Sequence, residues 1–364
     1  MTKVLVVATS RKTRGGITAV VNAHERGEQW QKYHCRWIET HRDRGVAVKL
    51  WYFVQALITY LFLLPGYDIV HIHLSEPASA IRKLPFMWWA MVWKKKTVVH
   101  FHSFSVDTTI AGRWAWVYRF HFGKANIVIT LSEYWLNSVM QFLQDTYGKV
   151  RVVYNPCPDI NESKGNSAFA DSDVTMPKQN VILYAGTITP RKGYADLIRA
   201  FATIAPQHQD WMIVFAGNGE IEKGQSLACT LGIAAQTLFL GWCSGADKDR
   251  AFREAAVFCL PSHAEGFPMA VLDAWAYGLP VVTTPVGGIP DVAKNGENML
   301  LFEPGDINAL SQCLERMIED VKLRNKIARA SKRFACNEFS AGTINGQIGG
   351  IYEELEKQQN VKTK

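Results

Sequence analysis

Short apolar runs alternate with stretches of helical periodicity along the whole chain. Apolar runs at this spacing are typical of parallel β-sheets built from strand–helix–strand units. The expected strands are residues 3–8, 68–73, 97–102, 126–131 and 150–154 in the first half, and 181–185, 211–216, 237–241, 257–261 and 281–284 in the second. The pattern therefore predicts an α/β protein with two Rossmann-like, doubly wound parallel sheets.

A polar segment separates the two sets of strands. Residues 157–180 contain Gly, Pro and Asp at short intervals, which is typical of a connection between domains. A chain of 364 residues also favours two domains over one. We predict an N-terminal domain over residues 1–156, a C-terminal domain over residues 181–341, and a last segment, 342–364, that is mostly helical.

The most informative stretch is residues 257–284, VFCLPSHAEGFPMAVLDAWAYGLPVVTT. An apolar strand leads into a turn with Glu265, and Pro268 favours the start of a helix that ends at Gly278. Glu265 and Asp273 thus flank one helix N-terminus. The free N–H groups of a helix N-terminus suit a phosphate, and carboxylates suit sugar hydroxyls. The stretch therefore predicts a nucleotide-sugar site.

Two further loops follow expected strands of the same half. Residues 186–193, GTITPRKG, place Arg191 and Lys192 where they can meet a pyrophosphate. Residues 217–219, Gly-Asn-Gly, allow the backbone to wrap close to a ligand. Open parallel sheets bind ligands at the carboxyl ends of their strands, so we expect these loops to contribute to one site. A solvated turn is the alternative for each loop.

The first half offers looser signals. Gly15 and Gly16 follow the first strand and open a helix, as in a phosphate loop, although the full Gly-x-Gly-x-x-Gly motif is absent. His100 and His102 lie on one face of another strand, and we expect His102 to line a cleft and His100 to be a core residue. The Asp-Ser-Asp at 171–173 lies in the polar connection. No His, Cys or carboxylate cluster has metal-ligand spacing, so we expect no metal site.

Charge and cysteine content constrain the partners and the compartment. Residues 1–155 contain 20 Lys and Arg against 9 Asp and Glu, and the remaining residues contain 20 against 24. The basic half suggests an anionic partner, either a membrane surface or a phosphorylated acceptor, with surface solvation as the alternative. Nucleic acid is not expected, because no recognised binding motif accompanies the charge. The seven cysteines form no C-x-x-C pair, which favours a reduced, cytoplasmic protein.

Tryptophans and cations occur together in two segments of the basic half, residues 82–96 and 112–124. Trp favours the membrane interface, and Lys and Arg favour anionic headgroups. We expect peripheral binding to an anionic membrane, with a buried helix as the alternative for residues 84–93. The longest apolar run, 50–64, is short for a transmembrane helix, and the N-terminus does not predict a signal peptide.

Together these motifs resemble the retaining glycosyltransferases of the GT4 family, which have a two-domain GT-B fold whose domains face a cleft. The resemblance spans nearly the whole chain. It rests on Gly15-Gly16, His102, Gly186…Lys192-Gly193, Gly217-Asn218-Gly219, residues 261–273 and residues 284–290. It implies that the N-terminal domain binds the acceptor, that the C-terminal domain binds the nucleotide sugar, and that the last helix crosses back to the N-terminal domain.

The resemblance also implies roles for the matching residues. Lys192 would hold the donor diphosphate, Glu265 would contact sugar hydroxyls, and Asp273 would bind the ribose. His102 would lie beside the transferred sugar, and Gly16 would approach the diphosphate from the opposite domain. The predicted catalytic residues are Glu265, His102 and Lys192, and the predicted donor-binding residues are Gly15, Gly16, Arg191, Lys192, Gly217, Asn218, Gly219, Glu265, Gly266, Phe267, Pro268, Met269 and Asp273.

Two positions depart from the family pattern. Asp273 stands where Glu is usual, and its side chain is one methylene shorter, so its ribose contact is expected to be longer or mediated by water. Thr187 stands where Arg is usual in the phosphate loop. Arg191, beside Lys192, is the candidate for the missing charge.

We therefore predict a metal-independent, retaining hexosyltransferase with no cofactor beyond its nucleotide-sugar donor. Its acceptor is expected to be a glycan or a lipid-linked molecule of surface-glycan biosynthesis, and its location the cytoplasm, at the inner face of the membrane. Three alternatives remain. A two-carboxylate hydrolase would not need a phosphate cradle, a nucleotide-sugar epimerase would turn over donor without an acceptor, and a non-catalytic nucleotide-sugar binding module would release no diphosphate.

Overall fold

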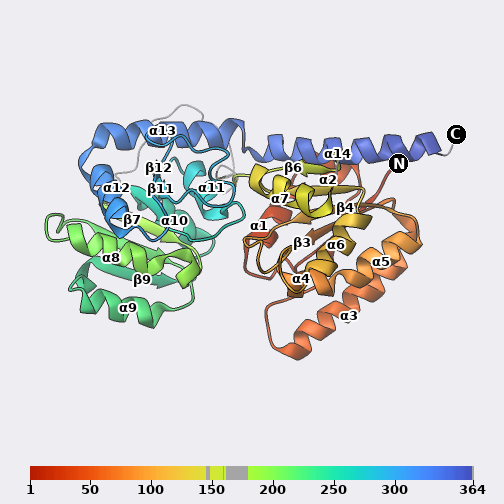
Figure 1. Ribbon diagram of the computed structural model, residues 1–364, viewed down its shortest axis with the longest axis horizontal. Coiled ribbons are helices and arrows are strands. Elements are labelled where there is room, and N and C mark those ends of the chain that lie inside the picture. Colours follow the sequence, from red (N-terminus) through yellow and green to blue (C-terminus); the bar gives the residue numbers. More distant parts are fainter. Residues whose placement is uncertain (145–147, 159, 161–178, 363–364) are drawn as a thin grey trace. The chain divides into compact units, whose positions relative to one another are not determined.

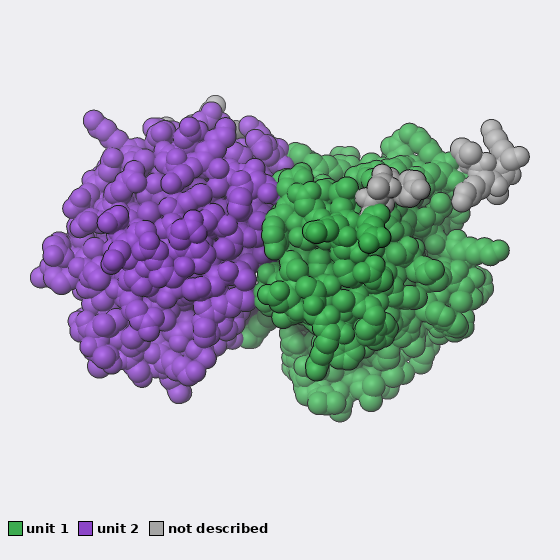
Figure 2. Space-filling view, in the orientation of Figure 1, with its two compact units in different colours: residues 1–156, 341–364 green, residues 157–340 purple. Residues whose placement is uncertain are grey.

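The computed structural model of the protein describes residues 1–144, 148–158, 160 and 179–362. Most of the predicted connection, and with it the Asp-Ser-Asp sequence at 171–173, lies outside the described residues. The chain forms two compact units (Figure 2). Unit 1 contains residues 1–156 and 341–364, and unit 2 contains residues 157–340.

Unit 1 is built around a six-stranded parallel sheet with the strand order β2-β1-β3-β4-β5-β6 (Figure 1). The strands are β1 (Val4–Ala8), β2 (Arg36–Glu39), β3 (Ile69–Leu74), β4 (Lys96–Phe101), β5 (Ile127–Thr130) and β6 (Val150–Val152). All residues of β1, β3 and β5 are buried. Helices cover both faces of the sheet, which explains why these strands are buried throughout rather than alternating between buried and exposed residues.

The helices of unit 1 form two layers. They are α1 (Gly16–Glu25), α2 (Glu28–Lys32), α3 (Val46–Leu63), α4 (Pro77–Arg82), α5 (Leu84–Val92), α6 (Ala115–Lys124), α7 (Glu133–Leu143) and α14 (Ala341–Lys362). Residues of α3 to α7 are buried in one core cluster with one face of the sheet. On the other face, the last helix, α14, buries Ile344, Ile348 and Leu355 against Val4 and Ile69. The end of the chain is thereby part of unit 1.

Unit 2 repeats the architecture with a second six-stranded parallel sheet, in the order β12-β11-β10-β7-β8-β9. Its strands are β7 (Val181–Ala185), β8 (Met212–Ala216), β9 (Thr237–Gly241), β10 (Val257–Leu260), β11 (Val281–Thr283) and β12 (Leu300–Leu301). Its helices are α8 (Tyr194–Ile204), α9 (Ile221–Thr230), α10 (Ala246–Glu254), α11 (Met269–Ala276), α12 (Ile307–Glu319) and α13 (Val321–Asn337). The predicted fold class, two doubly wound parallel sheets, is confirmed.

The sequence analysis missed two strands, β2 and β12. β2 is short, and its first residue, Arg36, is exposed and charged, so it does not form an apolar run. β12 has only two residues, Leu300 and Leu301. Each lies at one end of its sheet, where a single neighbouring strand is enough to hold it.

The apolar run at 50–64 belongs to a longer helix than expected. With the turn that follows α3, the stretch Val46–Gly66 has 21 residues and is long and apolar enough to cross a membrane by length and composition, and 11% of its most apolar window is buried. The expectation that this run is too short was therefore wrong. The helix begins four residues before Leu50, and the single charge at Lys49 does not interrupt it.

Candidate functional site

Unit 2 gathers three loops at one edge of its sheet. The strands β10, β7 and β8 are neighbours, and the three predicted loops follow them directly. The backbone N–H of Ile188 donates to Asn218 O at 2.8 Å, and that of His263 donates to Arg191 O at 2.8 Å. The loops are therefore held together by the main chain, at the carboxyl ends of the strands, where open parallel sheets bind their ligands.

Glu265 lies at the centre of a charged cluster in these loops, with 7% of its surface exposed. Lys192 Nζ contacts its Oε1, and Arg191 Nη1 lies 3.7 Å from its Oε2. Ser262 Oγ donates to Oε1 at 2.7 Å. Burying a carboxylate is costly unless it is paired and hydrogen-bonded, and all three neighbours meet that requirement. The cluster places two cations beside a fixed carboxylate, which suits an anionic ligand that also has hydroxyl groups.

Two glycines make this close packing possible. Gly193 has φ of 70°, and a Cβ at this position would lie 1.9 Å from Pro261 O. A Cβ on Gly217 would lie 1.8 Å from Gly186 O. Any other residue would push the loops apart, so the first glycine fixes Lys192 beside the β10 loop and the second fixes the β8 loop against the β7 loop.

The N-terminus of α11 follows the Glu265 loop. Pro268 precedes the first helical residue, Met269, and no side chain of the described chain caps the helix there. Two contacts within unit 2 hold the loop in place: Gly288 N–H donates to Gly266 O at 2.7 Å, and the ring of Phe267 stacks on Phe339. The first N–H groups of the helix and its dipole therefore favour a negatively charged ligand group beside Lys192 and Glu265.

Asp273 lies on the buried side of α11 and is 8% exposed. Its carboxylate pairs with Lys248 Nζ of α10 at 2.7 Å. Burial raises the pKa of Asp273, and the ion pair with Lys248 opposes this shift. The sequence analysis did not identify Lys248, because a lysine in a strongly polar helix is usually solvated.

The predicted residues of unit 1 lie at the ends of two strands. Gly15 is the N-cap of α1, with φ of 147°, and both Gly15 and Gly16 are exposed. His102 follows β4, where its Nε2 lies 2.9 Å from His73 Nδ1 and its ring stacks on that of His100 at 4.2 Å. Burial, reinforced by His24 and Lys83, lowers the pKa of His102 to about 3. The imidazole is therefore neutral and held in place by other rings.

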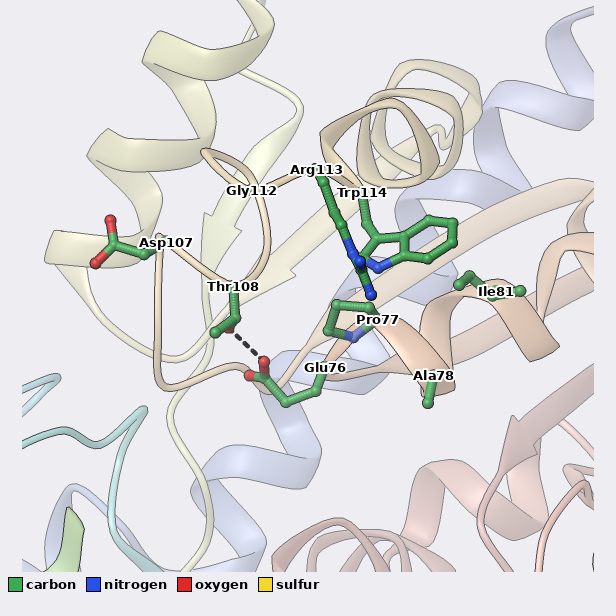
Figure 3. Close-up of a pocket in the computed structure, with 9 residues that line it drawn as sticks. All are labelled: Glu76, Pro77, Ala78, Ile81, Asp107, Thr108, Gly112, Arg113 and Trp114. Carbon is green, nitrogen blue, oxygen red and sulfur yellow. Dashed lines mark hydrogen bonds between the residues drawn. The ribbon is translucent and has the colours of Figure 1, made fainter. Parts of the chain in front are cut away.

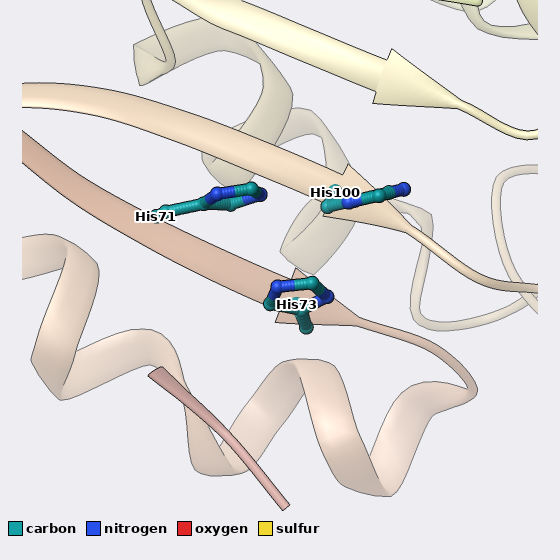
Figure 4. Close-up of side chains that lie close together, drawn as sticks. All are labelled: His71, His73 and His100. Atoms are coloured by element: carbon teal, nitrogen blue, oxygen red, sulfur yellow. The ribbon is translucent and has the colours of Figure 1, made fainter. Parts of the chain in front are cut away.

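Three buried histidines lie close together beneath His102. His71 and His73 come from β3 and His100 from β4, and one ring nitrogen of each lies within 4.8 Å of the others (Figure 4). Sequence spacing missed this cluster because it joins two strands that pair across the sheet. The rings stack, with interplanar angles of 14° to 30°, and His71 Nδ1 bonds to the hydroxyl of Tyr352 at 2.6 Å. Stacked rings direct their in-plane lone pairs side by side, whereas a tetrahedral metal ion needs them to converge. We assign the cluster to the core.

Unit 1 also contains a pocket of about 570 Å³ at the carboxyl ends of β3 and β4 (Figure 3). Glu76 accepts hydrogen bonds from Ser103 Oγ at 2.7 Å and from Thr108 Oγ1 at 2.5 Å, so its carboxylate is fixed. Arg113 and Trp114 form the opposite wall, and the Arg113 guanidinium points toward the pocket. The sequence analysis did not identify this pocket, because its residues come from three separate loops and helices.

Comparison with known proteins identifies the family. Residues 4–159 match the family model "Glycosyltransferase Family 4", and residues 169–334 match "Glycosyl transferases group 1". The chain belongs to the GT4-type glycosyltransferases. Its two sheets, with the helices that cover them, are the two halves of the GT-B fold.

Named relatives agree with this assignment. The chain is 29% identical over 234 residues to an uncharacterized glycosyltransferase, MJ1607, of Methanocaldococcus jannaschii, covering 62% of this chain and 59% of the relative. It is 31% identical over 182 residues to the capsular polysaccharide biosynthesis glycosyltransferase CapM of Staphylococcus aureus, covering 50% of this chain and 48% of the relative. The match thus spans about half to three fifths of the length of these curated relatives.

Solved structures agree on the fold of this GT4-type chain. Anabaena Alr3699/HepE in complex with UDP-glucose superposes with a TM-score of 0.76 at 19% identity, covering 97% of this chain and 100% of that chain. At this level of identity the likeness shows the GT-B fold alone.

Proposed function

We propose that this glycosyltransferase is a retaining hexosyltransferase that uses a nucleotide-diphosphate sugar. The observation that supports the donor class is the Glu265 cluster, where Lys192, Arg191 and the N-terminus of α11 surround a fixed carboxylate. Lys192 and Arg191 would bind the diphosphate, and Glu265 would bind sugar hydroxyls. The HepE structure with UDP-glucose has the same fold, which makes UDP-glucose the first donor to test.

In the proposed reaction, the bond between the sugar C1 and the diphosphate oxygen breaks as a bond to the acceptor oxygen forms on the same face. The acceptor proton passes to the departing phosphate oxygen. Positive charge develops on the sugar ring and negative charge on the diphosphate, as in glycoside transfer in general. Lys192, Arg191 and the α11 dipole would stabilise the leaving group without a metal ion. The neutral His102 would lie beside the transferred sugar, as the family resemblance implies.

Asp273 is assigned to the ribose. Its pairing with Lys248 keeps the carboxylate charged in a buried place, which preserves it as a hydrogen-bond acceptor. The backbones of the Gly217-Asn218-Gly219 loop and of residues 266–269 line the same edge of the sheet, and we assign them to the nucleotide and the diphosphate. Gly15 and Gly16 keep their predicted assignment to the diphosphate.

We assign the acceptor to the pocket of unit 1. Glu76 offers a fixed carboxylate for a hydroxyl, Arg113 offers a cation for a phosphate, and Trp114 offers a ring face for a sugar or a lipid. The relative CapM acts in capsular polysaccharide biosynthesis, which supports a glycan or lipid-linked acceptor. We further propose that the protein works in the cytoplasm, where exposed cations such as Lys94, Arg113 and Arg119 bind the anionic inner face of the membrane.

The test is to measure release of UDP or GDP from UDP- and GDP-hexoses, with and without lipid extracts as acceptors. Release that depends on acceptor, with a sugar–acceptor product of unchanged anomeric configuration, supports the proposal. Turnover of donor to an isomer without acceptor would identify an epimerase, and release of free sugar alone would identify a hydrolase. Tight donor binding with no release under any acceptor would identify a binding module.

A further inference from the structure

Six exposed large apolar side chains of unit 1 lie on α3. This helix lies next to α5 (Figure 1). Exposed apolar side chains recur along α3 at four-residue intervals, which spreads them over about 160° of the helix circumference, opposite its buried residues. They are Val46, Leu50, Val54, Ile58 and Phe62, and Trp51 extends the row. The exposed fractions are 61% for Leu50, 67% for Trp51 and 87% for Phe62, so the folded unit leaves these side chains in water. A soluble surface rarely carries an apolar row of this length without a partner.

The opposite side of α3 is attached to the fold. Ala56 and Tyr60 are buried, and the Tyr60 hydroxyl donates to Phe86 O of α5 at 2.7 Å. A helix that packs on its own unit along one side cannot be surrounded by lipid. With 18 residues, α3 is roughly 27 Å long and presents its apolar side parallel to the surface of the unit.

The apolar surface continues onto α5 and α6. Trp88, Val92 and Trp93 are about half exposed, and so is Trp116. Trp88 and Trp116 line an apolar groove of about 290 Å³ together with Leu84, Pro85 and Phe120. Trp116 also lies 6.5 Å, ring to ring, from Trp114 of the pocket assigned to the acceptor. The groove and the pocket are therefore neighbours on unit 1.

Cations border this surface. Lys49 projects from α3, Lys94 follows α5, Arg113 precedes α6, Arg119 lies in the middle of α6 and Lys124 is its last residue; all are exposed. Tryptophans and cations around an apolar side are the composition of helices that lie in the plane of a membrane interface. A second copy of the chain would meet the same positive charges and repel them, whereas anionic lipid headgroups complement them.

We propose that the apolar side of α3, with Trp88, Val92 and Trp93, is inserted into the acyl boundary of a lipid bilayer, with α3 lying in the membrane plane. This goes beyond the electrostatic contact proposed above, because apolar insertion persists at high salt and on uncharged lipid. Insertion of α3 would hold the acceptor pocket at the lipid surface. It rests on the surface of unit 1 alone and does not require the proposed transfer reaction.

The test is flotation of the full chain with vesicles of phosphatidylcholine, with and without 30% phosphatidylglycerol, in low salt and in 1 M NaCl. The expected result is binding to both vesicles, stronger on the anionic one, with a part that resists salt. The double variant Ile58→Ser/Phe62→Ser removes two exposed side chains and is expected to lower the partition coefficient roughly 100-fold, about tenfold for each. Lys49→Gln/Lys94→Gln should weaken only the salt-sensitive part.

The matched control is Leu238→Ser/Leu240→Ser, which removes two exposed leucines of unit 2 and should leave vesicle binding unchanged. Hydrogen exchange of β3 and β4 peptides shows that unit 1 of the α3 variants is folded, and donor binding shows the same for unit 2 of the control. Trp51→Phe keeps the apolar surface and should bind normally, with less fluorescence quenching by brominated acyl chains. Equal flotation of Ile58→Ser/Phe62→Ser and Leu238→Ser/Leu240→Ser would overturn the proposed insertion. Vesicle binding that 1 M NaCl abolishes would overturn it as well. So would a stable dimer in the absence of vesicles, or resistance to alkaline carbonate extraction, which indicates a spanning helix.

Discussion

Acid is expected to destabilise unit 1 steeply, because its core contains histidines that are neutral when folded. Burial is the main cause that lowers the pKa of each buried histidine. The pKa falls to about 4 for His24 and His121 and to about 3 for His102, and well below the usual value for His71, His73 and His100. Lys83 opposes protonation of His102 and His121 as well.

The direction and the size of the stability change follow from the linkage between proton binding and folding. In the unfolded chain these imidazoles titrate near pH 6.5. Above that pH both states are neutral and the stability is fully present. Below it only the unfolded state takes up protons, so stability falls with pH until the folded pKa of about 4 or 3 is reached. Each histidine costs about 1.4 kcal/mol per pH unit in this window, so His24, His102 and His121 alone cost about 6 kcal/mol at pH 5. That is comparable with the whole stability of a typical domain.

Because the chain has two units, a single unfolding midpoint would mix them, and hydrogen exchange separates them. The opening free energy of peptides from β3 and β4 should fall by several kcal/mol between pH 7 and pH 5. His121→Gln, which keeps the hydrogen bond from the ring Nε2 position to Ala80 O, should make the slope shallower by about 1.4 kcal/mol per pH unit. His34→Gln, at an exposed position, is the matched control and should leave the slope unchanged. A flat profile for β3 and β4 from pH 7 to pH 5 would refute the reasoning.

Four further predictions concern the donor site and the core. Glu265→Ala should lower kcat by roughly 10²–10³-fold with a smaller change in donor KM, because it removes a contact at the reacting sugar; an unchanged kcat in folded protein contradicts the assignment. Asp273→Ala should raise donor KM by roughly 10–150-fold, since ribose does not change in the reaction, and Asp273→Glu should be tolerated; equal damage by both would rule out the ribose role. Turnover should be the same in excess EDTA as in Mg²⁺ or Mn²⁺, because Lys192 and Arg191 supply the charge, and loss of turnover restored by either ion would disprove this. Lys83→Met should raise the melting temperature of unit 1 by a few degrees at neutral pH, read from a signal that reports unit 1 alone. Burial lowers the pKa of Lys83, so between its folded pKa and about 10.5 the unfolded state holds a proton that the folded state lacks, and the gain should shrink as the pH rises through this window.

The sheets could be predicted well because their strands are buried on both faces. Such strands are continuous apolar runs, and β7 has the bounds that the sequence predicts. β9 also has the predicted bounds, although it is a partly exposed edge strand, because its residues still form an apolar run. The edge strand β2 could not be found in this way, because it begins with an exposed arginine and pairs only with β1. The local pattern identifies strands that form an apolar run, including the edge strands β6 and β9, and it misses the edge strands β2 and β12, which do not form a run of that kind.

The donor loops were accessible from sequence for a different reason. Each follows an apolar strand directly, so the topology of a parallel sheet brings Lys192 and Glu265 to one edge although they are far apart in the chain. The partners that complete the cluster were not accessible. Lys248 comes from a polar surface helix and reaches Asp273 only through the packing of α10 beside α11, and no spacing in the sequence encodes that contact. The histidine cluster is similar, because His73 and His100 meet through the register of β3 and β4.

α3 shows how an apolar run can be misjudged when its length alone is considered. The run from Leu50 is short for a membrane span and too long for a strand, so its length indicates a helix but does not say how much of that helix the fold covers. Neighbouring elements would cover most of the circumference of a core helix, yet only Ala56 and Tyr60 of α3 are buried. The decisive quantity is the fraction of the apolar circumference that the fold covers, and it depends on how few neighbours α3 has beyond α5 and the edge of the sheet. The exposed side of α3 keeps apolar surface in contact with water, which is unfavourable. A lipid surface, rather than the protein core, is therefore the expected second partner of α3.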